Sequence, residues 1–285
     1  MSDYYQIEKL NERMYRLISK EAVYMDLIVG DHHALLFDTG FGYGDINATI
    51  EKATAKPLIV INSHGHIDHA SGNFQFPLVY IHPADKELLA QYTSCERRRG
   101  SIEGAKNSVD FATGEISNIL PDGFDEESYI NSGCSENLAN LCEGQVFDLG
   151  GITLEVVELP AHTAGSIGLL CPQERILYAG DAMNPFVWLF LPESLKLNVY
   201  ITTLKRALAL DFDNFIISHG PVPLPKSDLE VYRAIAESAD YNESFPFESP
   251  IMPGVDARVI VREGYSPNEM YRPGFAAIVI SKDKF

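Results

Sequence analysis

The chain has 285 residues and a formal net charge of −18, from 22 Lys and Arg against 40 Asp and Glu. Hydrophobic residues make up 46% and charged residues 22%, which is typical of a globular protein and excludes a disordered or low-complexity chain. The negative charge repels phosphate backbones and anionic membrane surfaces, so we expect no nucleic-acid partner and no membrane partner. The expected partner is a small-molecule substrate, and a homodimer is a further possibility that the sequence leaves open.

Cysteine usage and the first residues bear on location. The N-terminal residues lack a basic segment followed by an apolar run, so no secretory signal is expected. No apolar stretch approaches the roughly 20 residues that a membrane span needs. Four scattered cysteines are too few for a disulfide scaffold. We therefore expect a cytoplasmic protein with reduced thiols.

The first part of the chain reads as strands separated by turn residues. Three early strands predict a β-meander, and a helix is expected over residues 46–55. Residues 57–62, which follow this helix, contain a continuous apolar run, and such a run predicts a buried strand. The predicted strands are 14–18, 22–29, 34–37, 57–62 and 78–81.

A polar region rich in Gly, Ser and Asn comes next, with a short helical pattern over 84–92. We expect residues 86–142 to be a helical insertion that caps the functional site; an oligomer contact or a remote decoration is the alternative. A second strand-rich part follows, with strands over 144–149, 152–159, 166–171, 175–179 and 214–218, helices over 195–210 and 226–239, and a terminal strand pair within 255–285.

Two β-rich halves with amphipathic helices outside predict the fold class. Each sheet needs one face against the other sheet and one face under helices, so the expected architecture is α+β, a four-layer αββα sandwich. The length suits one domain over residues 1–285 with the insertion inside it.

The informative motif is a run of His and Asp directly after the buried strand. It reads His64-Gly-His66-Ile-Asp68-His69. Imidazole and carboxylate groups at this density suit zinc or a similar first-row metal. His64 and His66 are two apart in an extended segment and can bind one ion, whereas Asp68 and His69 can face a second ion. Surface or capping histidines are the alternative interpretation.

Three further candidate ligands stand where apolar strands end. His162 follows the strand that ends at residue 159, Asp181 follows the strand 176–179, and His219 follows the strand 215–218. Side chains at the ends of separate strands can converge above a sheet edge. Together with the histidine run they would complete a binuclear site.

In these motifs the sequence resembles the metallo-β-lactamase-fold hydrolase superfamily, and the segments around Asp181 and His162 are similar to its glyoxalase-II-like and lactonase-like branches. The resemblance spans residues of about 14 to 220, and it rests on Asp38 of Asp-Thr-Gly, the His64–His69 run, His162, Asp181 and His219.

The resemblance implies a division of the ligands between two metal ions. The first ion would be held by His64, His66 and His162, and the second by Asp68, His69 and His219, with Asp181 bridging them. Asp38 would orient the histidine loop without binding metal. Zinc is the favoured metal, and iron and manganese are compatible with the same ligands.

The expected activity is hydrolysis of a small acyl substrate, an ester, thioester, lactone or amide. A hydroxide bridging two divalent ions would be the nucleophile, since metal coordination lowers the pKa of water to about 7. Asp68 is the expected catalytic residue, because its carboxylate can orient that hydroxide or carry its proton to the leaving group.

Three alternatives stay open. An iron-dependent oxidoreductase of the same fold is one, although the diiron reductases carry Glu at the position of His66 and the single-iron dioxygenases leave the second site unused. A phosphodiesterase or nuclease would want a basic exosite, which the net charge disfavours. A metal-stabilised scaffold without activity would have closed ligand shells.

Two further segments carry chemistry without a fixed place in this scheme. Arg97, Arg98 and Arg99 form a basic run inside the predicted insertion, which we interpret as a solvated helical face, with anion binding as the alternative. The aromatic segment 186–190 can form an apolar substrate wall or pack in the core.

Overall fold

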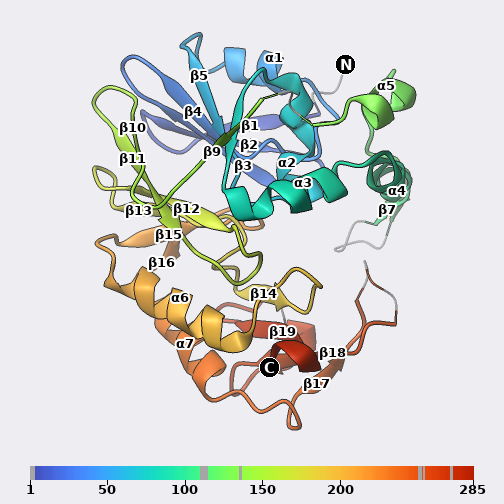
Figure 1. Ribbon diagram of the computed structural model, residues 1–285, viewed down its shortest axis with the longest axis vertical. Helices are drawn as coiled ribbons and strands as arrows, with labels where there is room; N and C mark the ends of the chain where they lie inside the picture. Colours follow the sequence, from blue (N-terminus) through green and yellow to red (C-terminus); the bar gives the residue numbers. More distant parts are fainter. Residues whose placement is uncertain (1–3, 110–114, 135–136, 250–251, 253, 270–271) are drawn as a thin grey trace. The chain divides into compact units, whose positions relative to one another are not determined.

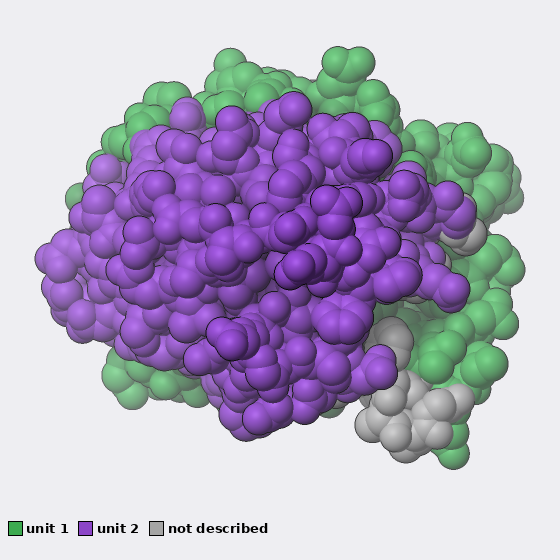
Figure 2. Space-filling model, turned by 90° about the horizontal axis from the view of Figure 1, so that it is seen from below, with its two compact units in different colours: residues 1–154, 218–221 green, residues 155–217, 222–285 purple. Residues whose placement is uncertain are grey.

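The computed structural model describes residues 4–109, 115–134, 137–249, 252, 254–269 and 272–285. Its chain divides into two compact units, coloured separately in Figure 2. Unit 1 comprises residues 1–154 and 218–221, and unit 2 comprises residues 155–217 and 222–285. The boundary at residue 154 falls within a strand, β11 (Thr153–Glu158).

Unit 1 is built on a seven-stranded sheet with the order β1-β2-β3-β4-β5-β6-β9. Strands β1 to β4 form an antiparallel meander, and β4, β5, β6 and β9 run parallel (Figure 1). The predicted meander is thereby confirmed, whereas the edge strand β1 was not predicted because its residues are mostly exposed. The strands are β1 (Gln6–Lys9), β2 (Met14–Ile18), β3 (Tyr24–Val29), β4 (Ala34–Phe37), β5 (Leu58–Ile61), β6 (Val79–Ile81) and β9 (Leu138–Asn140).

Helix α1 (Ile46–Glu51) covers this sheet and ends four residues before the predicted end at residue 55. Asp45 caps its start by accepting a hydrogen bond from the Ala48 amide at 2.9 Å. Ile46 and Ile50 are buried in one apolar cluster with Leu36 and Val60 of the sheet. The buried side of α1 therefore fastens the crossover between the parallel strands β4 and β5.

A buried ion pair lies in the meander. Arg16 on β2 and Asp26 on β3 are 2.9 Å apart and almost wholly buried. Arg16 also donates a hydrogen bond to the Gly220 carbonyl, and the Tyr24 amide donates to the Ser218 carbonyl at 2.9 Å. These contacts attach residues 218–221 to unit 1, although that segment is remote in sequence.

The predicted insertion over 86–142 contains α3 (Lys86–Tyr92), α4 (Cys95–Lys106), β7 (Ser108–Val109), β8 (Ile116–Ser117), α5 (Glu126–Asn131) and β9. Its residues 110–114 and 135–136 lie outside the described residues. Ser94 caps α4, and the helix contributes Ile102 and Ala105 to the apolar cluster of unit 1.

Arg98, the middle residue of the basic run, contradicts the interpretation of this run as a solvated helical face. Arg98 is fully buried and donates hydrogen bonds to the carbonyls of Thr93 (3.2 Å), Ser71 (3.0 Å) and Gly133. Its guanidinium also lies 4.6 Å from the ring centre of Tyr129. The charge is tolerated inside because backbone oxygens and an aromatic face replace water around it. Arg98 thus joins α4 to the chain just after the histidine run.

Unit 2 contains most of a second sheet, whose order is β10-β11-β12-β13-β15-β16. Helices α6 (Leu197–Ala209) and α7 (Asp228–Glu237), predicted over 195–210 and 226–239, pack in one apolar cluster with these strands. Leu204 and Leu229 represent the helices in that cluster, and Phe215 represents the sheet. The strands are β10 (Val146–Asp148), β11, β12 (Ile167–Cys171), β13 (Ile176–Tyr178), β15 (Asn214–Ile216) and β16 (Leu224–Pro225).

A four-stranded sheet with the order β14-β19-β18-β17 completes unit 2. The strands β18 (Ala257–Val261) and β19 (Ala277–Ser281) pair antiparallel, and β14 (Phe186–Leu189) runs parallel to β19. β17 (Phe245–Phe247) forms the other edge. Phe190, just after β14, is buried in the cluster of this sheet, and Phe186 and Trp188 pack against it, so the aromatic segment is largely core.

The described residues hold no helix with the length and apolarity that crossing a membrane requires.

Candidate metal centre

The histidine run joins β5 to α2 (Ile67–Ala70) in unit 1. Around it, Asn62 and Asn73 exchange a side-chain hydrogen bond at 2.7 Å, and Thr39 bonds the Asn73 side chain at 2.9 Å. Gly65 in the middle of the run has no room for a side chain, because a Cβ there would lie 2.9 Å from the Asp85 carbonyl and the Leu89 amide. The loop is therefore pressed directly against the start of α3.

His64 and His66 lie side by side, as their spacing predicted. The Nε2 atom of His64 and the Nδ1 atom of His66 are 2.9 Å apart, and both imidazoles are buried. The Ser63 hydroxyl is 2.9 Å from His64 Nδ1, which leaves Nε2 of His64 for the shared centre. The ring of Tyr92, the last residue of α3, lies 4.8 Å from the ring of His66, measured between centres.

Asp68, His69 and His219 form a second cluster, in which one potential ligand atom from each residue lies within 4.8 Å of the others. The Asp68 Oδ2 atom is 3.3 Å from His69 Nε2 and 3.4 Å from His219 Nε2. His69 is buried, whereas His219 is exposed at the chain segment that Arg16 attaches to unit 1.

The charge of Asp68 is stabilised by these neighbours. Burial alone would raise the pKa of its carboxyl, but the charge of His69 and the hydrogen bond from His219 outweigh burial and hold that pKa well below its ordinary value. Asp68 is therefore a carboxylate at neutral pH, as a metal ligand or proton acceptor must be.

Asp38, at the end of β4, contacts the histidine run from behind. Its carboxylate accepts hydrogen bonds from the Ser63 amide and hydroxyl, both at 2.7 Å, and from His69 Nδ1 at 2.9 Å. The Ser218 hydroxyl, one residue before His219, donates to it at 3.5 Å. Asp38 has a φ of +70°, a strained conformation for a residue with a side chain, and strain of this kind persists where the surroundings enforce it.

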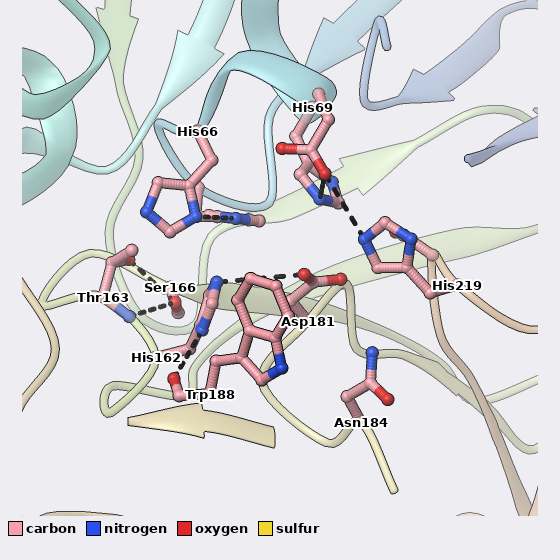
Figure 3. A network of polar contacts seen from close by, with 12 residues as sticks. His66, His69, His162, Thr163, Ser166, Asp181, Asn184, Trp188 and His219 are labelled. Carbon is pink, nitrogen blue, oxygen red and sulfur yellow. Dashed lines mark hydrogen bonds and ion pairs between the residues drawn. The ribbon is translucent and has the colours of Figure 1, made fainter. Parts of the chain in front are cut away.

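His162 and Asp181 belong to unit 2 and follow β11 and β13. The Nδ1 atom of His162 lies 2.9 Å from the Trp188 carbonyl oxygen, so the proton resides on Nδ1 and Nε2 remains a potential ligand. That Nε2 atom is 3.8 Å from the Asp181 carboxylate (Figure 3). Gly180, with a φ of +52°, provides the turn that follows β13.

The donors around Asp68 fit a metal ion by type and spacing. Two ligands at 2.0–2.1 Å from a tetrahedral zinc ion lie roughly 3.4 Å apart. The separations of 3.3 and 3.4 Å around Asp68 match this value. Nitrogen and oxygen donors together suit zinc, iron and manganese.

The structure brings all five candidate ligands of unit 1 together, and it places His162 and Asp181 side by side in unit 2. Sequence reasoning missed Ser63, Tyr92 and the Trp188 carbonyl. The Ser63 hydroxyl has a signal in its position, directly beside the first ligand. Tyr92 and the Trp188 carbonyl have none, because their contacts with His66 and His162 depend on how distant elements pack.

Comparison with known proteins gives relatives of moderate similarity. An acyl-coenzyme A thioesterase MBLAC2 from Bos taurus is 26% identical over 214 residues, covering 70% of this chain and 72% of that protein. A hydroxyacylglutathione hydrolase GloC from Haemophilus influenzae is 22% identical, covering 54% of this chain and 62% of that protein. One relative is named a thioesterase and the other a hydrolase, and both names describe hydrolytic enzymes, which confirms the prediction of a metallo-hydrolase enzyme.

Solved structures share the fold. A metallo-beta-lactamase from Pontibacter korlensis matches with a TM-score of 0.57 and 17% identity, covering 82% of this chain and all of that chain. The predicted α+β fold is thereby confirmed. A sequence model described as the metallo-beta-lactamase superfamily matches residues 22–234, about three quarters of the chain. The protein therefore belongs to the metallo-beta-lactamase superfamily.

Proposed function

We propose that this protein is a metal-dependent hydrolase of small acyl compounds, with thioesters as the first class to test. The observation that carries the proposal is the arrangement of Asp68 between His69 and His219, whose separations of 3.3 and 3.4 Å suit ligands of one ion. The relatives support the acyl class, since one is named an acyl-coenzyme A thioesterase and another a hydroxyacylglutathione hydrolase.

The proposed centre holds two divalent ions, most simply zinc. His64, His66 and His162 would hold one ion, Asp68, His69 and His219 would hold the other, and Asp181 would bind both. Seven donors exceed one tetrahedral shell, which supports two ions. Bound metal would supply an activated water at neutral pH and polarise the carbonyl of the substrate.

The protein side chains would then control protons and orientation. Asp68 is ionised and exposes about a quarter of its side chain, so it can accept a proton from the attacking water and deliver it to the leaving group. The acceptor Asp38 keeps the His69 proton on Nδ1 and its Nε2 directed to the centre. The Trp188 carbonyl likewise keeps the His162 proton on Nδ1, so that Nε2 of His162 can bind metal.

Hydrolysis assays on matched substrates test the proposal. Purified protein, loaded with zinc, manganese or iron in separate preparations, is assayed with an acyl thioester, the oxygen ester of the same acyl group, a lactone, an amide and a phosphodiester. We expect the thioester to have the highest kcat/KM, and Asp68→Asn to abolish its turnover. Asp31→Asn, an exposed change in the same unit, serves as control. A phosphodiester preferred over every acyl substrate by tenfold would overturn the acyl assignment.

A cytoplasmic location and a homodimer stay predictions. Metal analysis of protein purified without added metal would identify the native ion, and an iron content of two per chain without hydrolysis would favour the redox alternative.

A further inference from the structure

Three consecutive arginines lie near the start of helix α4, and they have different surroundings. Arg98 is buried, whereas Arg97 and Arg99 are exposed. The guanidinium carbon of Arg97 lies 4.8 Å from the ring centre of Tyr92, and the ring centres of Tyr92 and His66 are also 4.8 Å apart. Two such steps place the guanidinium within about 10 Å of the imidazole of a proposed metal ligand.

The position of Arg97 is poor for helix stability. It occupies the first turn of α4, where the helix dipole disfavours a positive charge. The neighbours three and four residues away are Thr93, Ser94, Gly100 and Ser101, so no carboxylate on the helix can pair with it. A residue that breaks such a local rule without local compensation often serves function.

Arg97 is also available for an external anion. It forms no ion pair with any residue that the structure describes, although the chain has 40 acidic residues against 22 basic ones. Several other surface cations are paired, for example Lys106 with Glu126 at 2.9 Å and Arg175 with Asp211 at 2.8 Å. No carboxylate among the described residues therefore compensates the charge of Arg97.

The contact with Tyr92 orients the guanidinium without using up its hydrogen-bond donors. An arginine held against an aromatic ring keeps N–H groups free at the edge of its plane, and that edge matches carboxylate or phosphate oxygens. Because Tyr92 also contacts His66, one short chain of side chains links an anion-binding group to the proposed centre.

We propose that Arg97, held by Tyr92, binds an anionic group of the substrate. The acyl compound then carries a carboxylate or phosphate beside the reacting group, because the Arg97 guanidinium lies within about 10 Å of the His66 imidazole. This inference rests on the proposed hydrolase function and narrows its substrate class. The anion can belong to the acyl group or to the leaving thiol.

A set of three thioesters distinguishes these sources. The neutral reference is the acetyl thioester of N-acetylcysteamine. The succinyl thioester of the same thiol places a carboxylate on the acyl group, and acetyl-coenzyme A places phosphates on the leaving group. Each is assayed with the wild type, Arg97→Gln, Arg97→Lys and the matched control Arg99→Gln.

We expect Arg97→Gln to lower the ratio of kcat/KM for an anionic thioester to that for the neutral one by tenfold or more, mainly through KM. Arg97→Lys should restore part of this preference, because it keeps the charge and loses the planar fork. Arg99→Gln should leave the ratio unchanged. Whichever anionic thioester shows the loss identifies the group that Arg97 binds. Equal losses for charged and neutral thioesters, or no loss, would overturn the proposal.

Binding measurements separate this inference from the hydrolase function. Two unreactive thioethers are titrated by calorimetry into the wild type and Arg97→Gln. One is a thioether of coenzyme A, and the other is a thioether of N-acetylcysteamine whose S-alkyl group carries a carboxylate. We expect at least one to bind the variant tenfold more weakly. If no thioester is hydrolysed but this difference is found, the proposed function fails and Arg97 still binds the anion. If the wild type and Arg97→Gln bind each thioether equally well, or if neither thioether binds, Arg97 does not have the proposed role.

Discussion

The carboxylate of Asp38 accepts a hydrogen bond from His69 Nδ1 at 2.9 Å, and Nε2 of the same imidazole lies 3.3 Å from Asp68. One carboxylate therefore sets the tautomer of the histidine, and the other shares the centre with it. Asp38 also receives the Ser63 amide and hydroxyl, so it holds both ends of the histidine run. This arrangement gives Asp38 influence over both proposed metal ions without contact to either.

Asp38→Asn is expected to weaken metal binding. The amide keeps the size of the side chain but accepts fewer hydrogen bonds, and loss of such a partner typically costs 10- to 100-fold in metal affinity. Competition with a fluorescent chelator measures the dissociation constants of the variant and the wild type. Asp31→Asn is the control, because its carboxylate pairs with Arg13 at the surface. Unchanged affinity in Asp38→Asn would contradict the orienting role.

The two-ion arrangement predicts metal contents that differ among variants. The wild type should bind two ions per chain. His219→Ala removes one ligand of the proposed second ion and should reduce the content toward one, because each protein ligand that is lost weakens the binding of that ion. His82→Ala, a change to a half-buried histidine outside the clusters, should retain two ions. A wild-type content of one ion under metal excess would rule out the binuclear proposal.

Arg98→Met is expected to destabilise the fold. The substitution leaves carbonyls of Thr93, Ser71 and Gly133 without their donor inside the protein, which costs roughly 2–4 kcal/mol of the free energy of unfolding. The matched change Arg99→Met, at an exposed position of the same helix, should stay within about 0.5 kcal/mol of the wild type. Urea unfolding monitored by circular dichroism compares the two. Similar midpoints would show that Arg98 is not an anchor of α4.

The contrast between Arg98 and the histidine run shows what a sequence pattern can predict. His64 and His66 lie side by side because they are neighbours in one extended segment, where local geometry decides. The end of a strand is another local signal in the sequence, and His219 stands just after one. The burial of Arg98 depends instead on carbonyls from Ser71 and Gly133, which other segments bring to it. A run of charges is hydrated in most proteins, so its sequence contains no sign of those partners.

The strand β14 illustrates the second kind of limit. Residues 186–190 follow a candidate ligand closely and are aromatic, so they were interpreted as a substrate wall or as core. These residues form a strand because they pair with β19, about 90 residues later, and their side chains pack in the core of unit 2. A parallel partner so distant leaves no periodic mark in four residues.

The ion pair of Arg16 and Asp26 predicts a pH dependence of stability. Burial raises the pKa of Asp26 from its ordinary value of 3.8 to about 6, and the nearby charge of Arg16 offsets only part of this effect. The folded state therefore holds the Asp26 proton more tightly than the unfolded chain does between pH 4 and 6. The resulting contribution to the free energy of unfolding is fully present below pH 4 and is lost as the pH rises through 6.

Asp26→Asn removes this titration and keeps the size of the side chain. Urea unfolding of both proteins at several pH values between 4 and 7 gives the difference in unfolding free energy, wild type minus variant. We expect that difference to fall by roughly 3 kcal/mol across this range, because each pKa unit corresponds to about 1.4 kcal/mol. The other carboxyl groups are present in both proteins, so their contributions largely cancel. A difference that stays constant with pH, or rises with it, would mean that Arg16 keeps Asp26 ionised throughout and that its charge outweighs burial.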